Sequence, residues 1–155
     1  LACKPDELAD RISQMKTKNK ELDKKLRAFE QKGQSGLADK LIDQAQIIEN
    51  LRFIKGVVPD INPNDLRSLA AQVNKRAAPS VVLLASESNG KCGMVCICSP
   101  EAIEAGHQAG KYLGELAQKL DGKGGGKPDV AMGGAPVGKG VKQALQSLSF
   151  PNKQE

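Results

Sequence analysis

The sequence predicts a mixed α/β (α+β) protein, in which an N-terminal helical arm precedes one small mixed-sheet domain with helices packed on it. Three observations support this prediction. Residues 6–32 lack Gly and Pro and repeat apolar side chains every three or four positions, as an amphipathic helix does. Short runs rich in Val, Ile and Leu follow from residue 51 onward, as in buried strands. The length of 155 residues allows one domain with an appendage.

The arm is expected to cover residues 1–50. Its apolar side chains form a heptad seam, with Ile12, Asn19 and Leu26 at position a and Leu8, Met15, Leu22 and Phe29 at position d. Gly33 and Gly36 then interrupt the pattern, and a second apolar series to residue 50 predicts a helical hairpin. The seam has two interpretations. Either it packs within the hairpin or on the rest of a longer protein, or it forms a dimerising coiled coil. In a coiled coil, the polar Asn19 would fix register and partner number.

The globular domain is expected at 51–150, with a tail at 151–155. Its elements in chain order are a strand at 51–58, a helix at 62–77, strands at 80–86 and 91–98, and helices at 100–120 and 138–148. Asn-Pro at 62–63 and Ser-Pro at 99–100 are typical helix starts, and Asn89-Gly90 is a hairpin turn. The first two strands should be parallel through a right-handed crossover, and the second and third antiparallel.

Composition and charge narrow the classes of function. Lys and Arg number 23 against 18 Asp and Glu, and the net charge of +5 favours a polyanionic partner without requiring one. No apolar run approaches the roughly 18 residues of a membrane-spanning helix, so no membrane association is expected. The chain begins with Leu1 and shows no signal-peptide pattern. We therefore expect a soluble segment of a longer protein.

Three of the four cysteines, Cys92, Cys96 and Cys98, share one predicted strand, whereas Cys3 lies near the N-terminus. Even positions on a strand share a face, so the three thiols should point the same way. Their spacing is not that of a zinc finger, which favours reduced core thiols and a reducing compartment. His107, the only histidine, is expected to be packed or at the surface. No nucleophile or carboxylate pair suggests catalysis.

Eight of the 16 glycines lie in residues 122–140, which predicts a glycine-rich loop. Glycine lets backbone N–H groups approach a phosphate closely, and Lys123, Lys127 and Lys139 add positive charge. The composition therefore favours a polyanion-binding loop over a flexible linker. Residues 133–139 match the G-x-x-x-x-G-K pattern of ATP-binding loops, but a glycine follows where Ser or Thr must hold Mg²⁺. ATP binding is not expected.

The segment from Asp121 to Gly134, DGKGGGKPDVAMGG, resembles the glycine motif near the C-terminus of alanyl-tRNA synthetases, GGKGGG[RK]PDxAxGG. The likeness extends upstream over essentially the whole chain. It implies the domain often called C-Ala, a helical subdomain followed by a globular domain of the kind found with DHH phosphoesterases. Asp121 and Met132 stand where many members have Gly and Gln. Lys127 stands where the phosphoesterases have His, which favours the synthetase.

The resemblance implies a non-catalytic domain that contacts the elbow of an alanine-specific tRNA and helps the parent's aminoacylation and editing domains act on it. It also implies a contribution to dimerisation. The implied tRNA-binding residues are Lys119, Lys123, Gly124, Gly125, Gly126, Lys127, Lys139 and Lys142. No cofactor or metal is expected in this segment, because the family's ATP and zinc sites lie in other domains. The expected location is the cytoplasm or the mitochondrial matrix.

Two other functions remain open at this point. The first is a structural module, whose heptad arm dimerises the parent and whose glycine segment only braces the final helix. The second is the nucleic-acid-binding half of a DHH-type phosphoesterase, which predicts a DHH catalytic domain upstream in the parent protein. Measured RNA binding would separate the structural module from the other two functions.

Overall fold

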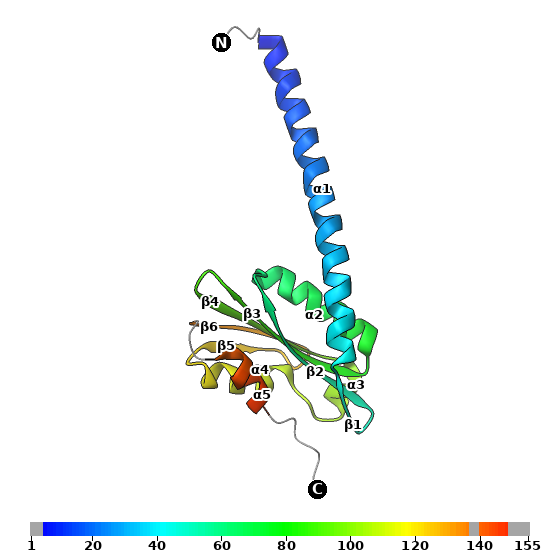
Figure 1. Cartoon of the computed structure of the whole chain (residues 1–155), viewed down its shortest axis with the longest axis vertical. Helices are drawn as coiled ribbons and strands as arrows, with labels where there is room; N and C mark the ends of the chain where they lie inside the picture. Colours follow the sequence, from blue (N-terminus) through cyan, green and yellow to red (C-terminus); the bar gives the residue numbers. More distant parts are fainter. Residues whose placement is uncertain (1–4, 137–139, 149–155) are drawn as a thin grey trace. The chain divides into compact units, whose positions relative to one another are not determined.

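The computed structural model describes residues 5–136 and 140–148, and the side chains of these residues except at positions 5, 6, 27, 29–32, 34 and 35. The chain consists of two compact units, Leu1–Leu37 and Ala38–Glu155. The described part of the first unit is helical, and the second unit contains the sheet (Figure 1). None of the described helices combines the length and apolar content needed to cross a membrane.

Helix α1 (Pro5–Asp43) continues through Gly33 and Gly36, so the predicted helical hairpin is wrong. A glycine inside a helix costs only about 1 kcal/mol relative to Ala, which neighbouring helical turns can offset. The apolar series after Gly36 belongs to the sheet unit instead. Ala38 and Leu41 in the last turns of α1 are buried there. The end of that series forms a strand, because residues 46–48 pair with the sheet.

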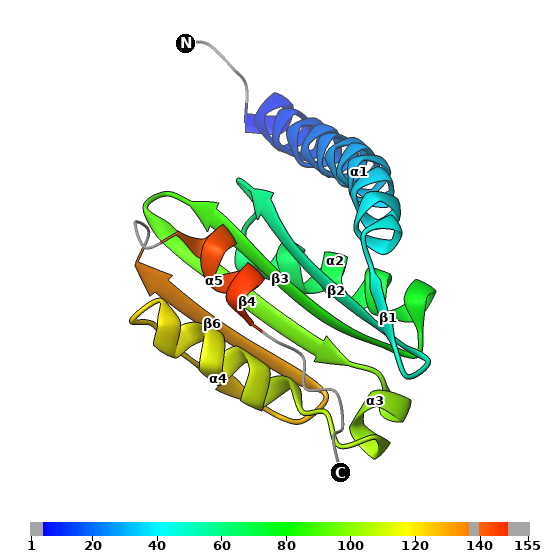
Figure 2. The same cartoon turned by 60° about the horizontal axis from the view of Figure 1, so that its bottom comes forward.

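Six strands form one mixed sheet in the order β1-β2-β3-β4-β6-β5 (Figure 2). They are β1 (Gln46–Ile48), β2 (Leu51–Pro59), β3 (Ser80–Ser88), β4 (Lys91–Cys98), β5 (Lys123–Gly126) and β6 (Val130–Pro136). Strands β2 and β3 are parallel, and β3 and β4 are antiparallel, as the sequence predicts. The mixed-sheet fold class is therefore confirmed, and β5 lies at one edge of the sheet.

Helices cover the two faces of the sheet. They are α2 (Pro63–Ala77), α3 (Pro100–Glu104), α4 (Ala109–Lys119) and α5 (Val141–Ser147). Figure 2 shows α4 and α5 on one face, with α2 behind the sheet. The predicted start of α2 is confirmed, because the Asn62 side chain accepts a hydrogen bond from the Asp65 N–H at 2.9 Å. The single helix predicted at 100–120 is wrong: Gly106, with φ of 96°, follows the end of α3.

The three strand cysteines share the sheet face that packs against α4 and α5, and all three are buried free thiols. This confirms the core role predicted for Cys92, Cys96 and Cys98, whereas Cys3 lies outside the described residues. Burial raises the pKa of the Cys92 thiol to about 11, and the Glu87 carboxylate acts in the same direction. His107 packs edge-on against Phe53, with ring centroids 5.2 Å apart, as expected of a packed histidine.

Candidate nucleic-acid interface

The glycine-rich segment forms a β-hairpin, so the predicted loop is wrong over most of its length. Strands β5 and β6 pair in register, and the Lys127 N–H donates to the Val130 carbonyl at 3.0 Å to close the turn. The turn is held from two sides. The Asp129 carbonyl accepts from the Cys98 N–H at 2.9 Å, and the Pro128 carbonyl accepts from the Ala109 N–H at 2.8 Å. These bonds fix the hairpin to β4 and to the start of α4.

Most glycines of the hairpin are explained by close packing. A Cβ atom on Gly133 would lie 2.7 Å from the Gly124 Cα and 2.8 Å from the Lys123 carbonyl oxygen. A Cβ atom on Gly126 would lie 2.6 Å from the Ala131 Cα, and one on Gly124 would lie 3.2 Å from a Leu113 methyl group of α4. Any larger residue at these positions would push β5 away from β6 or α4. Their glycine identity therefore requires no ligand.

Gly125 is different, because a Cβ atom there would meet nothing within 4 Å. Side chains alternate along a strand, so Lys123 and Gly125 face away from α4, on the face that carries α2. Lys127 continues this alternation just beyond the strand, and all three residues are exposed. The edge of the sheet thus presents Lys123 and Lys127, one on each side of Gly125. No packing contact requires a glycine at position 125.

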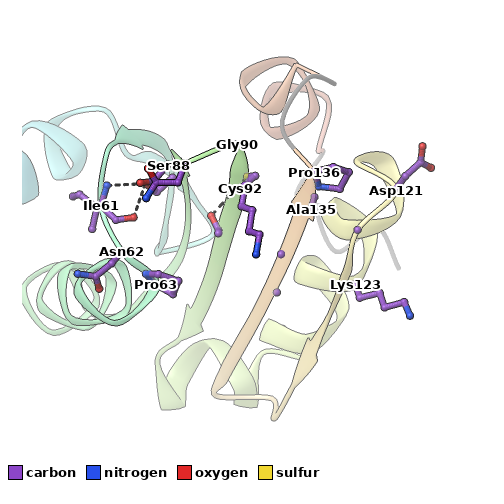
Figure 3. A pocket seen from close by; sticks show the side chains of 17 residues that line it. Ile61, Asn62, Pro63, Ser88, Gly90, Cys92, Asp121, Lys123, Ala135 and Pro136 are labelled. Atoms are coloured by element: carbon purple, nitrogen blue, oxygen red, sulfur yellow. Dashed lines mark hydrogen bonds between the residues drawn. The ribbon is translucent and has the colours of Figure 1, made fainter.

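A groove of about 930 Å³ lies over this face of the sheet (Figure 3). Asn62 and Pro63 at the start of α2 line one side, and Lys123 on β5 lines the other. Gly93 and Gly134 pair across β4 and β6 and leave the floor without side chains. The groove floor is therefore backbone, and the charged side chains of its lining are Lys91, Lys123 and Asp121.

Lys91 is a further cation of the groove that the sequence analysis missed. It is exposed and lies two residues before Gly93, so it shares the face that carries Lys123. The signal was present in the sequence, because the Asn89-Gly90 turn sets which residues of the following strand share a face.

The lysines predicted to bind tRNA lie on opposite faces of the sheet. Lys119 on α4 donates to the Ser147 hydroxyl at 2.9 Å and to its carbonyl at 3.2 Å, at the end of α5. Lys142 lies on α5, whose apolar residues pack with α4 on the other face. Lys139 lies outside the described residues. Lys91 and Lys123 therefore line one groove, and Lys127 lies on the same face outside the groove lining. Lys119 and Lys142 are on the helices of the other face.

Two lysines on the α5 face, Lys55 and Lys119, have contacts that explain their presence. The Lys55 ammonium donates to the Leu148 carbonyl at 2.8 Å, close to the Lys119 contacts with Ser147. Burial lowers the pKa of Lys55, and the nearby charge of Lys119 lowers it further. Cations beside the last carbonyls of a helix stabilise its end. Lys55 and Lys119 therefore anchor α5 to the sheet unit.

The heptad seam of the first unit is exposed along α1. The exposed fractions are 50% for Leu8, 46% for Ile12, 68% for Met15, 60% for Leu22 and 62% for Leu26. Asn19 is exposed as well, and the side chain of Phe29 lies outside the described residues. A stripe of large apolar side chains at this exposure is typical of an interaction surface.

Comparisons with known proteins match most of the chain. The DHHA1 domain family model matches residues 50–149. An alanine–tRNA ligase of Opitutus terrae is 46% identical over 130 residues, which cover 84% of this chain and 14% of that protein. One of Psychrobacter sp. is 32% identical over 148 residues, covering 96% and 16% respectively. The chain thus spans only a small part of each relative.

The crystal structure of the C-Ala domain from Aquifex aeolicus alanyl-tRNA synthetase superposes on this chain with a TM-score of 0.59 and 28% identity. The superposition covers 66% of this chain and 92% of that domain.

Proposed function

The chain belongs to the DHHA1 domain family, and we propose that it is the non-catalytic, tRNA-binding C-terminal domain of an alanine–tRNA ligase. One observation carries the proposal beyond the family: Lys91 and Lys123 line the groove over one face of the sheet. The alternation along β5 puts the exposed Lys127 on the same face, outside the groove lining. We propose that this face contacts the elbow of an alanine-specific tRNA. The contact would help the aminoacylation and editing domains of the parent act on that tRNA, in the cytoplasm or an organelle matrix.

The face has the chemistry that a phosphate backbone requires. Lysine ammonium groups attract phosphates as point charges, and the groove floor at Gly93 and Gly134 lets a nucleic acid approach the sheet closely. The alternation of an antiparallel ladder, set by the Lys127–Val130 bond, directs the N–H groups of Gly124 and Gly126 outward at the sheet edge. These groups would add uncharged donors to the lysine charges.

We expect tRNA binding that weakens steeply with salt. Each phosphate contact releases counterions and adds about 0.9 to the slope of log affinity against log salt for duplex, so three lysines predict a slope of about −2.7 or steeper. Fluorescence anisotropy with labelled tRNA at increasing salt measures it. No binding at about 50 mM salt, or an affinity that salt leaves unchanged, would contradict the proposal.

A second function is favoured by the packing of the glycines. The contacts of Gly124, Gly126 and Gly133 favour a structural role for the hairpin, as the structural-module hypothesis has it. They join β5 to β6 and to α4, however, and not to the final helix that this hypothesis has the glycine segment brace. The two functions differ at Lys123 and Lys127, because a brace does not need their charges. The relatives named above are alanine–tRNA ligases, which supports the synthetase over the phosphoesterase hypothesis.

The exposed seam supports self-association of the domain through α1, which we include in the proposal. Asn19→Leu should then strengthen self-association or change the number of chains, since a polar residue at position a specifies partner number at a cost in stability. Sedimentation velocity over a concentration series measures both. A variant that stays monomeric like the unmodified chain would argue against a coiled coil.

A further inference from the structure

We propose that Asp121 is a specificity residue of the groove, whose carboxylate accepts a hydrogen bond from an uncharged donor group of the bound nucleic acid. The donor is a ribose 2′-hydroxyl or a base amino group. This inference rests on the proposed function and deepens it, because it names a residue that distinguishes RNA from other polyanions. It follows from the position of Asp121 at the end of α4, where local structure does not favour an acidic residue.

The backbone of Asp121 adopts a conformation that favours glycine. Its φ is 52°, and it directly follows Leu120, the C-cap of α4. The Asp121 N–H donates to the Gln118 carbonyl at 3.3 Å, and the Gly122 N–H donates to the Ala117 carbonyl at 2.8 Å. This pair of bonds forms the Schellman motif, in which glycine is the usual residue with positive φ. Glycine would therefore fit position 121 with less strain than Asp.

The charge of Asp121 is also at the unfavourable end of α4. The C-terminal end of a helix carries a partial negative charge, so cations are favoured there and carboxylates are not. Lys119 in the last turn of α4 agrees with this rule, whereas Asp121 opposes it. A residue that opposes local preference in two ways points to a function of its side chain.

Asp121 lies where a bound nucleic acid would meet it. It lines the groove together with Lys91 and Lys123. Figure 3 shows Asp121 and Lys123 on the rim opposite Asn62 and Pro63. The lining thus combines two cations with one carboxylate, and all three of these charged residues are exposed.

Packing of the next residue holds Asp121 at this rim. A Cβ atom on Gly122 would lie 2.6 Å from the Ala135 Cβ and 2.9 Å from the Ala135 Cα. The chain at position 122 therefore lies directly against β6, which forms part of the groove. Asp121 is fixed on one side by this contact and on the other by the end of α4.

The chemistry of a carboxylate then suggests what Asp121 recognises. An ionised carboxylate only accepts hydrogen bonds and repels phosphate, so it would weaken a surface that attracts phosphates alone. It accepts strongly from O–H and N–H groups, because hydrogen bonds to ionised groups are stronger than neutral ones. Nucleic acids carry such donors on the ribose 2′-hydroxyl and on base amino groups. With phosphates at Lys91 and Lys123, RNA can offer a donor to Asp121, whereas a polyanion without donors meets only repulsion there.

Two variants of the 155-residue chain test the inference. Asp121→Gly should bind labelled tRNA about tenfold more weakly than the unmodified chain at the same salt concentration, because a hydrogen bond to a charged group is lost. Asp121→Asn should lie between the two, since its neutral amide oxygen accepts more weakly. Both variants should bind inorganic polyphosphate, which has no such donors, as tightly as the unmodified chain or more tightly, because a repulsive charge is removed.

Glu115→Gln is the matched control, because it removes one negative charge from an exposed position of α4 outside the groove lining. This variant should keep the ratio of tRNA affinity to polyphosphate affinity. Thermal unfolding separates binding from folding: Asp121→Gly should melt at the same temperature as the unmodified chain or slightly higher, since glycine relieves the positive φ.

A tRNA with 2′-deoxyribose in the loops that form the elbow distinguishes the two sources of the donor. If the donor is a 2′-hydroxyl, the unmodified chain should bind this tRNA about tenfold more weakly, and Asp121→Gly should lose nothing further. If the donor is a base amino group, the unmodified chain should keep its advantage over Asp121→Gly on both tRNAs.

Three results would overturn the inference. The first is Asp121→Gly binding tRNA as tightly as the unmodified chain or more tightly. The second is an equal loss of affinity for tRNA and polyphosphate together with a lower melting temperature, which would show a structural role for Asp121. The third is an unmodified chain that binds no tRNA at all. Only this third result would also overturn the proposed function, so the two failures are distinguishable.

Discussion

Replacing Gly133 by Ala is expected to lower the free energy of unfolding of the sheet unit by about 3 kcal/mol. The new methyl group would lie 2.7 Å from the Gly124 Cα and 2.8 Å from the Lys123 carbonyl oxygen, and both atoms belong to the backbone of a paired strand. Strand β5 must then move away from β6 or from α4, because a side-chain rotation cannot relieve the clash. Thermal unfolding should show a melting temperature lower by on the order of 10 °C.

Gly125→Ala is the matched control in the same hairpin. A Cβ atom there meets nothing within 4 Å, so we expect the melting temperature to stay the same or to rise slightly. Equal melting temperatures for the two variants would mean that the hairpin does not pack as closely as described. The pair of variants therefore separates glycines that the fold requires from the one that the fold leaves free.

Replacing Lys123 and Lys127 together by Ala is expected to weaken tRNA binding about tenfold or more at low salt. The slope of log affinity against log salt should shrink by about two, because two phosphate contacts are lost. Both side chains are exposed, and a change to Ala leaves the backbone of the hairpin in place. The melting temperature should therefore change little. Anisotropy titrations at several salt concentrations, combined with thermal unfolding, measure both quantities.

Lys111→Ala with Lys142→Ala makes the matched control, since it removes the same total charge from the α4 and α5 side of the sheet. Both lysines are exposed there. This variant should keep most of the salt slope if tRNA binds on the groove side. Equal losses in the two double variants would mean that net charge alone governs binding. Unchanged affinity after loss of Lys123 and Lys127 would favour the structural-module hypothesis.

The sequence predicts the central elements of the fold well because strong local signals mark them. The Asn62-Pro63 start, the Asn89-Gly90 turn and the apolar runs between them fix α2, β3 and β4. The errors occur where local signals oppose long-range contacts. Gly33 and Gly36 suggest a break, yet the helix continues until it reaches the sheet. Consecutive glycines have low strand propensity, and only pairing with β6 and packing under α4 hold residues 123–126 extended.

The candidate site is predictable in part for the same reason. Lys123 on β5 and Lys127 just beyond it share a face because they are four residues apart along an alternating strand. Their role in binding tRNA stays a prediction. Lys119 and Lys142 are also close in sequence to the glycines, but the sheet lies between them and the groove. The Asn89-Gly90 turn indicates which face of β4 carries Lys91, but only the pairing of β4 with β6, and of β6 with β5, brings that face beside Lys123. Nearness in sequence therefore identifies the lysines of one hairpin. The pairing of strands that are distant in sequence decides which other lysines share their face.

The central claim is that tRNA lies on the glycine-lined face at Gly125. Cross-linking tests it most directly, with a short photoreactive group on Gly125→Cys and, as a control, on Lys111→Cys, both in a Cys3→Ser background. The remaining thiols are buried, which leaves the introduced cysteine as the reactive one. We predict a strong cross-link to bound tRNA from position 125 and little from position 111. A cross-link of equal or greater yield from position 111 would contradict the account.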